Sequence, residues 1–320
     1  MDIHILYFRE IDNEILKKNN NRFFQEDFIK ELFSSNKKIN FIHQDYDAKK
    51  DYNSKNIILY CHDLRHYKKY FEKFKKKNYL VIHLFDENLG HDVSLYKNEN
   101  VKHIFREMIR PALDQKKITN IPLGYKSGLI EYSKPSNSNR IYKWSFCGFL
   151  NKNGRDKFCE KLKEIKPYYC FNTKATWSFD LNSEEYSDIL NKTLFVPCFS
   201  GNTNIETQRL VEALEHGCIP IVNKYYKFPI LRTRYLKYDY HNYNYYENLF
   251  GEHPLPIVDN SYSSYYLPSS YYSMFATKVK QLLIEENVEE LRLNIQDWWN
   301  NYKKKLKIDI SNTVYNSFIE

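Results

Sequence analysis

Apolar runs and amphipathic stretches alternate along the first half of the chain. The stretch Leu64–Phe74 places apolar residues at intervals of three and four, which is typical of a helix with one buried face. A second helical pattern covers Arg22–Phe33. Short apolar runs predict strands at Ile3–Phe8, Ile39–Ile42, Ile57–Cys61, Tyr79–Leu84 and Val101–Phe105. Repeated strand–helix units of this kind predict a mostly parallel sheet with helices on both faces.

A second series of the same type follows the polar, proline-containing segment Lys134–Arg140, which we interpret as a linker. Its predicted strands are Tyr142–Cys147, Tyr168–Asn172, Leu194–Cys198 and Cys218–Val222, and its predicted helices are Gly154–Ile165, Ser183–Asn191 and Ile205–His216. The chain is therefore predicted to be an α/β protein with two Rossmann-like domains, over residues 1–138 and 139–290, facing a central cleft. Ser273–Lys307 is predicted to be helical, and we expect residues 291–320 to cross back toward the first domain.

Composition and charge limit the kinds of partner and the cellular location that we expect for this chain. The 320 residues are 42% apolar with a formal net charge of +8, which suits a phosphorylated or polyanionic partner without requiring nucleic acid. The six cysteines form no CxxC pair and show no metal-ligand spacing, so we expect reduced thiols, no metal site and a cytoplasmic location. The sequence has neither a recognisable signal peptide nor an apolar run of about 18 residues, so no membrane span is expected.

The segment Thr193–Val222 forms a strand–loop–helix–strand unit with a polar, glycine-containing loop before the helix Ile205–His216. Thr203 is the expected N-cap of this helix, and Glu206 would complete a capping box. Helix N-termini present free N–H groups and a partial positive charge, so the loop is a natural phosphate site. The loop residues expected to bind there are Gly201, Asn202 and Thr203.

Arg209, Glu212 and His216 form a polar stripe along the same helix, opposite its apolar face. An arginine there can hold a phosphate through charge-assisted hydrogen bonds, and a carboxylate can accept from the hydroxyl pair of a ribose. The alternative is that the stripe is the solvated side of an ordinary surface helix.

Four stretches carry a family likeness. Arg209–Val222 has the sequence RLVEALEHGCIPIV, and Phe146–Phe149, FCGF, is followed by Arg155. His83–Glu87 has the sequence HLFDE, and Ile121–Tyr125 has the sequence IPLGY. Together these motifs resemble those of the exostosin-like glycosyltransferases, in the branch that contains ribitol xylosyltransferase and the xylosyltransferases of algal and giant viruses.

The resemblance implies a GT-B fold and an inverting transfer of one sugar, with xylose as the best match, from a UDP-sugar donor to a hydroxyl of an oligosaccharide or glycan acceptor. It also implies independence of metal ions and no permanently bound cofactor. The family's pyrophosphate-binding arginines would correspond to Arg155 and Arg209, and its ribose-binding glutamate to Glu212. The first domain would then bind the acceptor and the second domain the donor.

An inverting transfer needs a carboxylate that takes the proton of the acceptor hydroxyl. Asp86 is the first candidate and Glu87 the second, because both directly follow a predicted strand; Asp63, after another strand, is the third. Asp86 can equally cap a turn, and His83, inside the strand, is expected to be a core residue. Arg110 is a candidate for neutralising the diphosphate leaving group, with capping of a helix end as the alternative.

Two other functions are kept as alternatives. A nucleic-acid-binding module fits the net charge, but basic and aromatic residues do not interleave in a recognisable motif, so we expect no nucleic-acid partner. A catalytically inactive relative that binds glycans or nucleotides is the other alternative.

Overall fold

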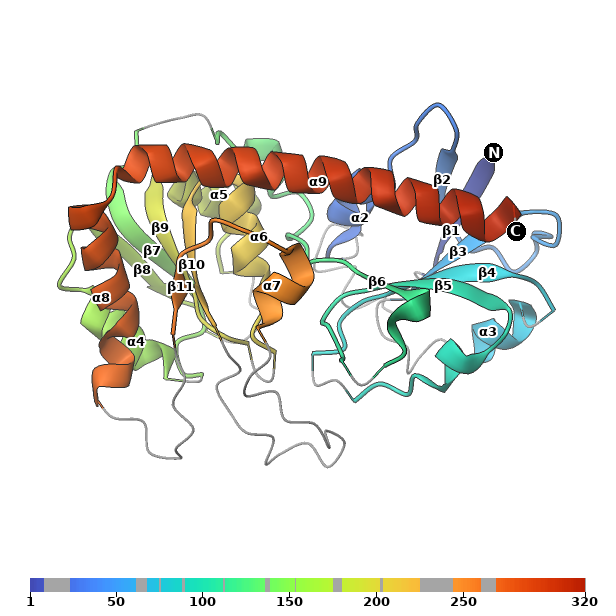
Figure 1. The fold of residues 1–320 in the computed structure, drawn as a ribbon, viewed down its shortest axis with the longest axis horizontal. Helices are drawn as coiled ribbons and strands as arrows, with labels where there is room; N and C mark the ends of the chain where they lie inside the picture. Colours follow the sequence, from blue (N-terminus) through green and yellow to red (C-terminus); the bar gives the residue numbers. More distant parts are fainter. Residues whose placement is uncertain are drawn as a thin grey trace. The chain divides into compact units, whose positions relative to one another are not determined.

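The structure is a computed structural model that describes residues 1–8, 24–61, 68–74, 76–87, 90–111, 113–135, 139–152, 154–174, 180–201, 204–224, 244–259 and 269–319. The chain divides into two compact units, Met1–Ser127 with Lys303–Glu320, and Gly128–Tyr302 (Figure 1). Each unit is built on one parallel sheet with helices, so the predicted α/β class with two parallel sheets is confirmed. Within the described ranges, no helix has both the length and the apolarity that crossing a membrane requires.

The sheet of the first unit has six parallel strands in the order β2-β1-β3-β4-β5-β6. Its strands are β1 (Asp2–Tyr7), β2 (Asn40–Asp45), β3 (Asn56–Cys61), β4 (Tyr79–His83), β5 (Val101–Arg106) and β6 (Ile118–Asn120). Besides the end of the C-terminal helix, the described helices of this unit are α2 (Glu26–Leu32), α3 (Lys68–Phe74) and the short 3-10 helices η3 (Ser94–Lys97) and η4 (Gln115–Lys117). The five predicted strands are all present, and only the short edge strand β6 was not predicted.

Strands β3 and β4 are buried along nearly their whole length. This continuous burial is characteristic of parallel strands that are covered on both faces. It also explains why these segments are recognisable in the sequence as unbroken apolar runs rather than as alternating patterns.

The last part of α9 (Val288–Ile319) belongs to the first unit. Leu306, Ile310 and Val314 recur every four residues and are buried, as expected for the apolar stripe of a helix packed on a core. Lys303 and Lys307 also donate hydrogen bonds to Glu31 of α2 at 3.1 and 3.0 Å. This stretch of α9 is therefore an integral part of the first unit.

The sheet of the second unit has five parallel strands in the order β11-β10-β9-β7-β8. Its strands are β7 (Tyr142–Gly148), β8 (Tyr168–Asn172), β9 (Thr193–Cys198), β10 (Ile219–Asn223) and β11 (Ile257–Val258). Its helices are η5 (Ile130–Tyr132), α4 (Arg155–Leu162), α5 (Ser183–Asn191), α6 (Gln208–Glu215), α7 (Tyr245–Phe250), α8 (Ser269–Glu285) and the first part of α9. In Figure 1, α4 and α8 lie on one side of this sheet, and α5 and α6 lie on the other.

The strand order places a topological switch point in the second sheet. From β7 the chain runs to β8 on one side and then returns to β9 on the other side. In open parallel sheets, ligands bind at the carboxyl ends of the two strands that flank such a point. A ligand of this unit is therefore expected to bind at the residues that follow β7 and β9.

Two predicted boundaries differ from the structure. The helical region predicted at Ser273–Lys307 consists of two helices, because α8 ends at Glu285 and α9 begins at Val288. The chain divides after Ser127, before the predicted linker, and Arg140 inside that linker is anchored in the second unit. Its guanidinium donates to the carbonyl oxygens of Leu190 and His216 at 2.8 and 2.7 Å.

Candidate functional site

Two arginines from different helices meet at the switch point of the second unit. Arg155 is the first residue of α4, and Arg209 is the second residue of α6. The Arg209 guanidinium carbon lies 4.3 Å from the ring centre of Phe146, and that of Arg155 lies 5.9 Å from the same centre. Phe146 is near the carboxyl end of β7, so two positive charges converge where a ligand of this sheet is expected.

Both guanidinium groups are held by backbone carbonyl oxygens at the strand ends. Arg209 Nη2 donates to Cys147 O at 2.7 Å, and Arg155 Nη2 donates to Ser200 O at 2.9 Å. Neither contact neutralises the charge of the side chain. Among the described residues, Arg209 Nε has no hydrogen-bond partner. The pair therefore provides fixed positive charge of the kind that recognises a phosphate.

Gly148 is required for the position of Arg209. A Cβ atom built on Gly148 lies 2.5 Å from Arg209 Nη2, far inside van der Waals contact. Any larger residue in place of Gly148 displaces the guanidinium from the strand end. This explains in physical terms why a glycine follows Cys147 in the FCGF stretch.

Glu212 lies one helical turn after Arg209 and is only 6% exposed. Its Oε2 accepts a hydrogen bond from the hydroxyl of Tyr186 in α5 at 3.0 Å. Burial places this carboxylate inside the unit rather than on a solvated helix face. The surface-helix interpretation of the polar stripe is therefore wrong for this residue.

His216 is also not part of a solvated stripe, because it is fully buried. Its Nδ1 lies 2.7 Å from the carbonyl oxygen of Glu212, and its Nε2 lies 3.0 Å from the hydroxyl of Ser187. Burial lowers the pKa of His216 to about 4, so its ring is neutral at physiological pH. His216 is a core residue that joins α6 to α5.

The helix start was predicted too early. Helix α6 begins at Gln208 with Thr207 in the N-cap position, so Thr203 is not its N-cap and no capping box forms with Glu206. Glu206 is instead buried and accepts a hydrogen bond from the hydroxyl of Tyr245 in α7 at 2.6 Å. This contact ties the segment before α6 to α7, and Thr207, the residue that precedes the helix, has an extended backbone.

The loop predicted to bind phosphate is described only in part. Gly201 is buried, and its N–H donates to the carbonyl oxygen of Asn204 at 2.8 Å. Asn202 and Thr203 lie outside the described residues. The donors that the structure describes at this end of the sheet include those of the two arginines and of the start of α6.

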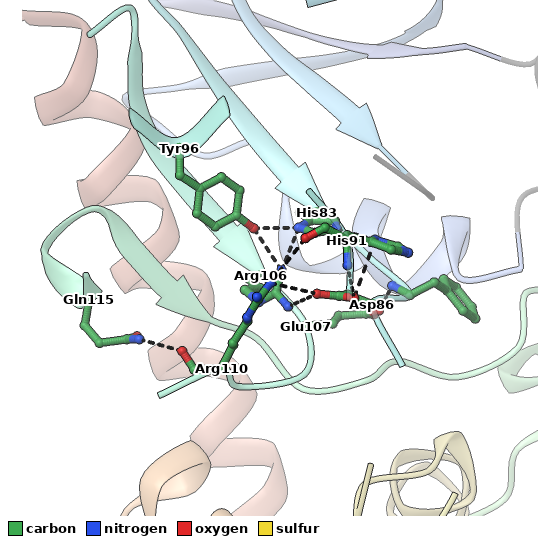
Figure 2. A network of polar contacts seen from close by, with 9 residues as sticks. His83, Asp86, His91, Tyr96, Arg106, Glu107, Arg110 and Gln115 are labelled. Carbon is green, nitrogen blue, oxygen red and sulfur yellow. Dashed lines mark hydrogen bonds and ion pairs between the residues drawn. The ribbon is translucent and has the colours of Figure 1, made fainter. Parts of the chain in front are cut away.

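In the first unit, Asp86 lies in a buried polar network beyond the carboxyl end of β4 (Figure 2). Its Oδ2 accepts from Arg106 Nη2 at 2.5 Å, and its Oδ1 accepts from the backbone N–H of His91 at 2.9 Å. Arg106 Nη1 also donates to the hydroxyl of Tyr96 at 2.9 Å. Asp86 is 1% exposed, so its carboxylate faces these partners and not solvent.

Arg106 was missed by sequence reasoning. It is the last residue of β5 and is 1% exposed. The available signal was a charged residue directly after the apolar pair Ile104 and Phe105 at the end of a strand, since a buried arginine requires a partner. The identity of that partner depends on the pairing of β4 with β5, which the sequence does not specify.

His83 is buried in β4, as expected for a core residue. Its Nδ1 lies 2.7 Å from Arg106 Nη1, and because a guanidinium can only donate, Nδ1 is the acceptor. The proton of the ring is therefore on Nε2, which donates to His91 Nδ1 at 2.9 Å. Burial, with Arg106 adding to it, holds the pKa of His83 well below its usual value, so the ring is neutral.

His83, Asp86 and His91 are the group in the described part of the chain whose geometry comes closest to a metal site. One potential ligand atom of each lies within 4.8 Å of the others. However, His83 Nε2 carries a proton and His91 Nδ1 accepts it, so neither nitrogen has a lone pair available. The adjacent Arg106 charge also opposes a cation. The chemistry of this donor set fits a closed hydrogen-bond network better than a metal.

The backbone is strained at the carboxyl ends of β4 and β5. Phe85 and Met108 have φ angles of 58° and 57°, in the left-handed region that residues other than glycine rarely adopt. The Phe85 N–H donates to Glu107 Oε2 at 3.3 Å. Strain of this kind is commonly found at functional sites, and here it directs Asp86 into the network.

The other predicted residues of the first unit are less enclosed. Glu87 is half-buried and directly follows Asp86. Arg110 Nη1 donates to the carbonyl oxygen of His91 at 3.2 Å and lies 3.9 Å from Asp86 Oδ2. Arg110 follows β5 and does not end a helix, so the capping alternative is wrong. Asp63 lies outside the described residues.

Comparison with known proteins adds no family assignment. No protein-family model matches the sequence, and no curated protein matches it significantly. Functional inference therefore rests on the motifs and on the geometry of the two groups of residues described above.

Proposed function

We propose that this chain is an inverting glycosyltransferase of GT-B type that transfers a sugar from a UDP-sugar to a hydroxyl of a glycan. The observation that carries the proposal is the convergence of Arg155 and Arg209 on Phe146 at the switch point of the second sheet. Fixed positive charge at the carboxyl ends of parallel strands suits a diphosphate better than a neutral ligand.

In this proposal the two arginines bind the diphosphate and stabilise the charge that develops on the leaving group. Such preorganised electrostatic stabilisation requires neither proton transfer nor rearrangement of the site. Glu212, within one helical turn of Arg209, accepts hydrogen bonds from the ribose hydroxyls. No resident cofactor is needed, and the resemblance implies that the arginines take the role that a divalent cation has in other glycosyltransferases.

The proton acceptor is proposed to come from the first unit. A general base must reach the acceptor hydroxyl, yet Asp86 is buried with Arg106 and the backbone N–H of His91 on its two oxygens. We therefore assign to Asp86 the role of anchoring the strand ends. Glu87, which is half-buried and next in the chain, takes the proton.

A panel of nucleotide sugars tests this function. UDP-xylose and other UDP-sugars are incubated with the protein in the presence of EDTA, with xylosides and larger glycans as acceptors. We expect slow hydrolysis of a UDP-sugar without acceptor and faster release of UDP with one, and we expect NMR spectra of the product to show inversion at the anomeric carbon. Release of UDP only after addition of a metal, or a product with retained configuration, would contradict the mechanism.

A further inference from the structure

The thiols of Cys159 and Cys170 meet where α4 packs on the second sheet. In β8, Cys170 is paired with Phe146 of β7, so both side chains point to the same face of the sheet. Helix α4 covers that face, because the rings of Phe158 and Phe146 both pack on Phe199, with centres 5.0 and 5.1 Å from its own. Cys159, next to Phe158, donates its S–H to the sulfur of Cys170. The packing thus joins two thiols that form no motif in the sequence.

These two thiols differ in exposure and in acidity. Cys170 is half-buried in the edge strand β8, whereas Cys159 is 1% exposed. The hydrogen bond from Cys159 lowers the pKa of Cys170 against the opposing effect of burial, and the Lys163 ammonium lowers it further. The same hydrogen bond and burial raise the pKa of Cys159. Cys170 therefore has both the more accessible position and the more acidic thiol.

The other four cysteines of the chain, all within the described residues, differ from Cys170. Burial raises the pKa of each of them, namely Cys61, Cys147, Cys198 and Cys218. The thiolate is the reactive form of cysteine, and buried thiols with a raised pKa are inert. Reactivity is therefore expected at Cys170.

We propose that Cys159 and Cys170 are a redox-active pair that a peroxide oxidises to a disulfide. Cys170 reacts with the peroxide, and Cys159, whose thiol is hydrogen-bonded to it, closes the bond. The disulfide ties α4, which begins with Arg155, to the edge strand β8. The reaction involves no nucleotide sugar and is independent of the proposed transfer.

Hydrogen peroxide supplies the oxidising equivalents. The Cys170 sulfur attacks one peroxide oxygen, the O–O bond breaks, and Cys170 becomes a sulfenic acid while the other oxygen leaves as water with the thiol proton. The Cys159 sulfur then attacks the sulfenic sulfur, the S–S bond forms, and the hydroxyl leaves as a second water with the Cys159 proton. The two thiols thus lose two electrons and two protons to one peroxide. A dithiol reverses the reaction by exchange and is itself oxidised to a disulfide.

The test is mass spectrometry of the full wild-type chain. The protein is reduced with dithiothreitol, freed of reductant, treated with equimolar hydrogen peroxide, alkylated and digested without reduction. We expect peptides joined through Cys159 and Cys170, from chains that remain monomeric on a non-reducing gel, and we expect dithiothreitol to separate them. A disulfide that joins other cysteines, or a Cys170 that remains a thiol, would overturn the proposal.

Iodoacetamide labelling of the reduced wild type measures the reactivity of each thiol. We expect Cys170 to be labelled at least about 10-fold faster than any other cysteine at neutral pH, because its thiolate fraction is larger. Similar labelling rates for Cys170 and the other cysteines would contradict its role as the attacking thiol.

Three variants separate the roles of the two thiols. In Cys159→Ala the resolving thiol is absent, so peroxide should leave a sulfenic acid on Cys170 that dimedone traps. In Cys170→Ala, Cys159 should remain a thiol. Cys147→Ala is the matched control, because Cys147 is also half-buried and lies in the neighbouring strand β7, and it should form the disulfide as the wild type does. Loss of the disulfide in Cys147→Ala, or oxidation of Cys159 in Cys170→Ala, would overturn the assignment.

Discussion

At the scale of single residues, the two carboxylates Asp86 and Glu87 have different environments although they are adjacent in the chain. Asp86 is 1% exposed and paired with the equally buried Arg106, whereas Glu87 is half-buried. A buried ion pair is strongly destabilising to break, because its removal leaves an uncompensated charge inside the protein. Adjacent carboxylates can therefore have separate roles, one structural and one chemical.

Substitution of each carboxylate by its amide separates these roles. Asp86→Asn leaves Arg106 without its counter-ion and is expected to lower the free energy of unfolding by about 3 kcal/mol. Glu87→Gln is expected to change stability by less than about 0.5 kcal/mol and to abolish transfer with UDP affinity unchanged. Urea unfolding and activity assays measure both effects. If the Asp86→Asn variant were stable but inactive and the Glu87→Gln variant were active, Asp86 and not Glu87 would be the general base.

The buried histidine His216 makes stability depend on pH. Its folded-state pKa is lowered to about 4, below the unfolded value of 6.5, so only the unfolded chain takes up the proton between these values. Its contribution to stability is complete above pH 6.5 and is lost as the pH falls toward 4. Between pH 7 and pH 5 the expected loss is about 2 kcal/mol.

Urea unfolding at these two pH values checks the prediction. His216→Gln is expected to be less stable than wild type at pH 7 but to lose about 2 kcal/mol less on acidification. Equal acid losses in wild type and variant would show that His216 is protonated in the folded state.

At the scale of elements, the ends of β7 and β9 and the starts of α4 and α6 create the candidate site. Strand β7 supplies Phe146 and Gly148, and the two helices supply Arg155 and Arg209. The contacts between these groups are direct, so the position of one element determines the position of another's side chain.

Gly148→Ala tests this coupling. The added methyl group displaces the Arg209 guanidinium, so UDP affinity should fall about 10-fold or more. In an Arg209→Gln background the same substitution should have little further effect, because the group that it displaces is absent. Titration of UDP into the wild type, the two single variants and the double variant gives a double-mutant cycle, which measures the coupling between Gly148 and Arg209. Additive losses would show that Gly148 acts independently of Arg209.

At the scale of the whole molecule, α9 contributes to two units, because residues up to Tyr302 belong to the second unit and those from Lys303 to the first. Ile310 in the later part is fully buried, whereas Ile308, two residues before it, is 53% exposed. The end of the chain is therefore a structural component of the first unit rather than an appendage.

Two isoleucine substitutions measure this contribution. Ile310→Ala is expected to cost about 2–4 kcal/mol of unfolding free energy, since it removes a buried side chain. Ile308→Ala is expected to cost less than about 0.5 kcal/mol. Chemical denaturation compares them, and UDP binding by the second unit should persist in both. Equal stability of the two variants would mean that α9 does not pack in the first unit as described.

The sequence was sufficient for the longer parallel strands but not for the short edge strands β6 and β11, because buried strands such as β3 and β4 are recognisable as continuous apolar runs. The motifs also drew attention to Arg155 and Arg209, which the structure brings together at Phe146. The sequence did not locate the start of α6, because the hydrogen bond from Tyr245 to Glu206 depends on a helix that follows later in the chain.

The same limit applies to the partners of the site. Arg106 and Tyr186 donate hydrogen bonds to Asp86 and Glu212 across 20 and 26 positions of the chain. Such contacts depend on how strands pair and helices pack, and local periodicity carries no information about them. Residues that belong to a sequence motif are thus easier to predict than the residues that hold them in place.

The most direct test of the central claim is a calorimetric titration of UDP into the wild-type chain and the Arg209→Gln variant, with EDTA present throughout. Lys280→Gln is the control, because it removes a half-exposed positive charge of the same unit that pairs with Glu164. We expect wild type and Lys280→Gln to bind UDP equally, and Arg209→Gln to bind it about 10- to 100-fold more weakly. Absence of UDP binding to the wild type, or equal binding by Arg209→Gln, would contradict the account.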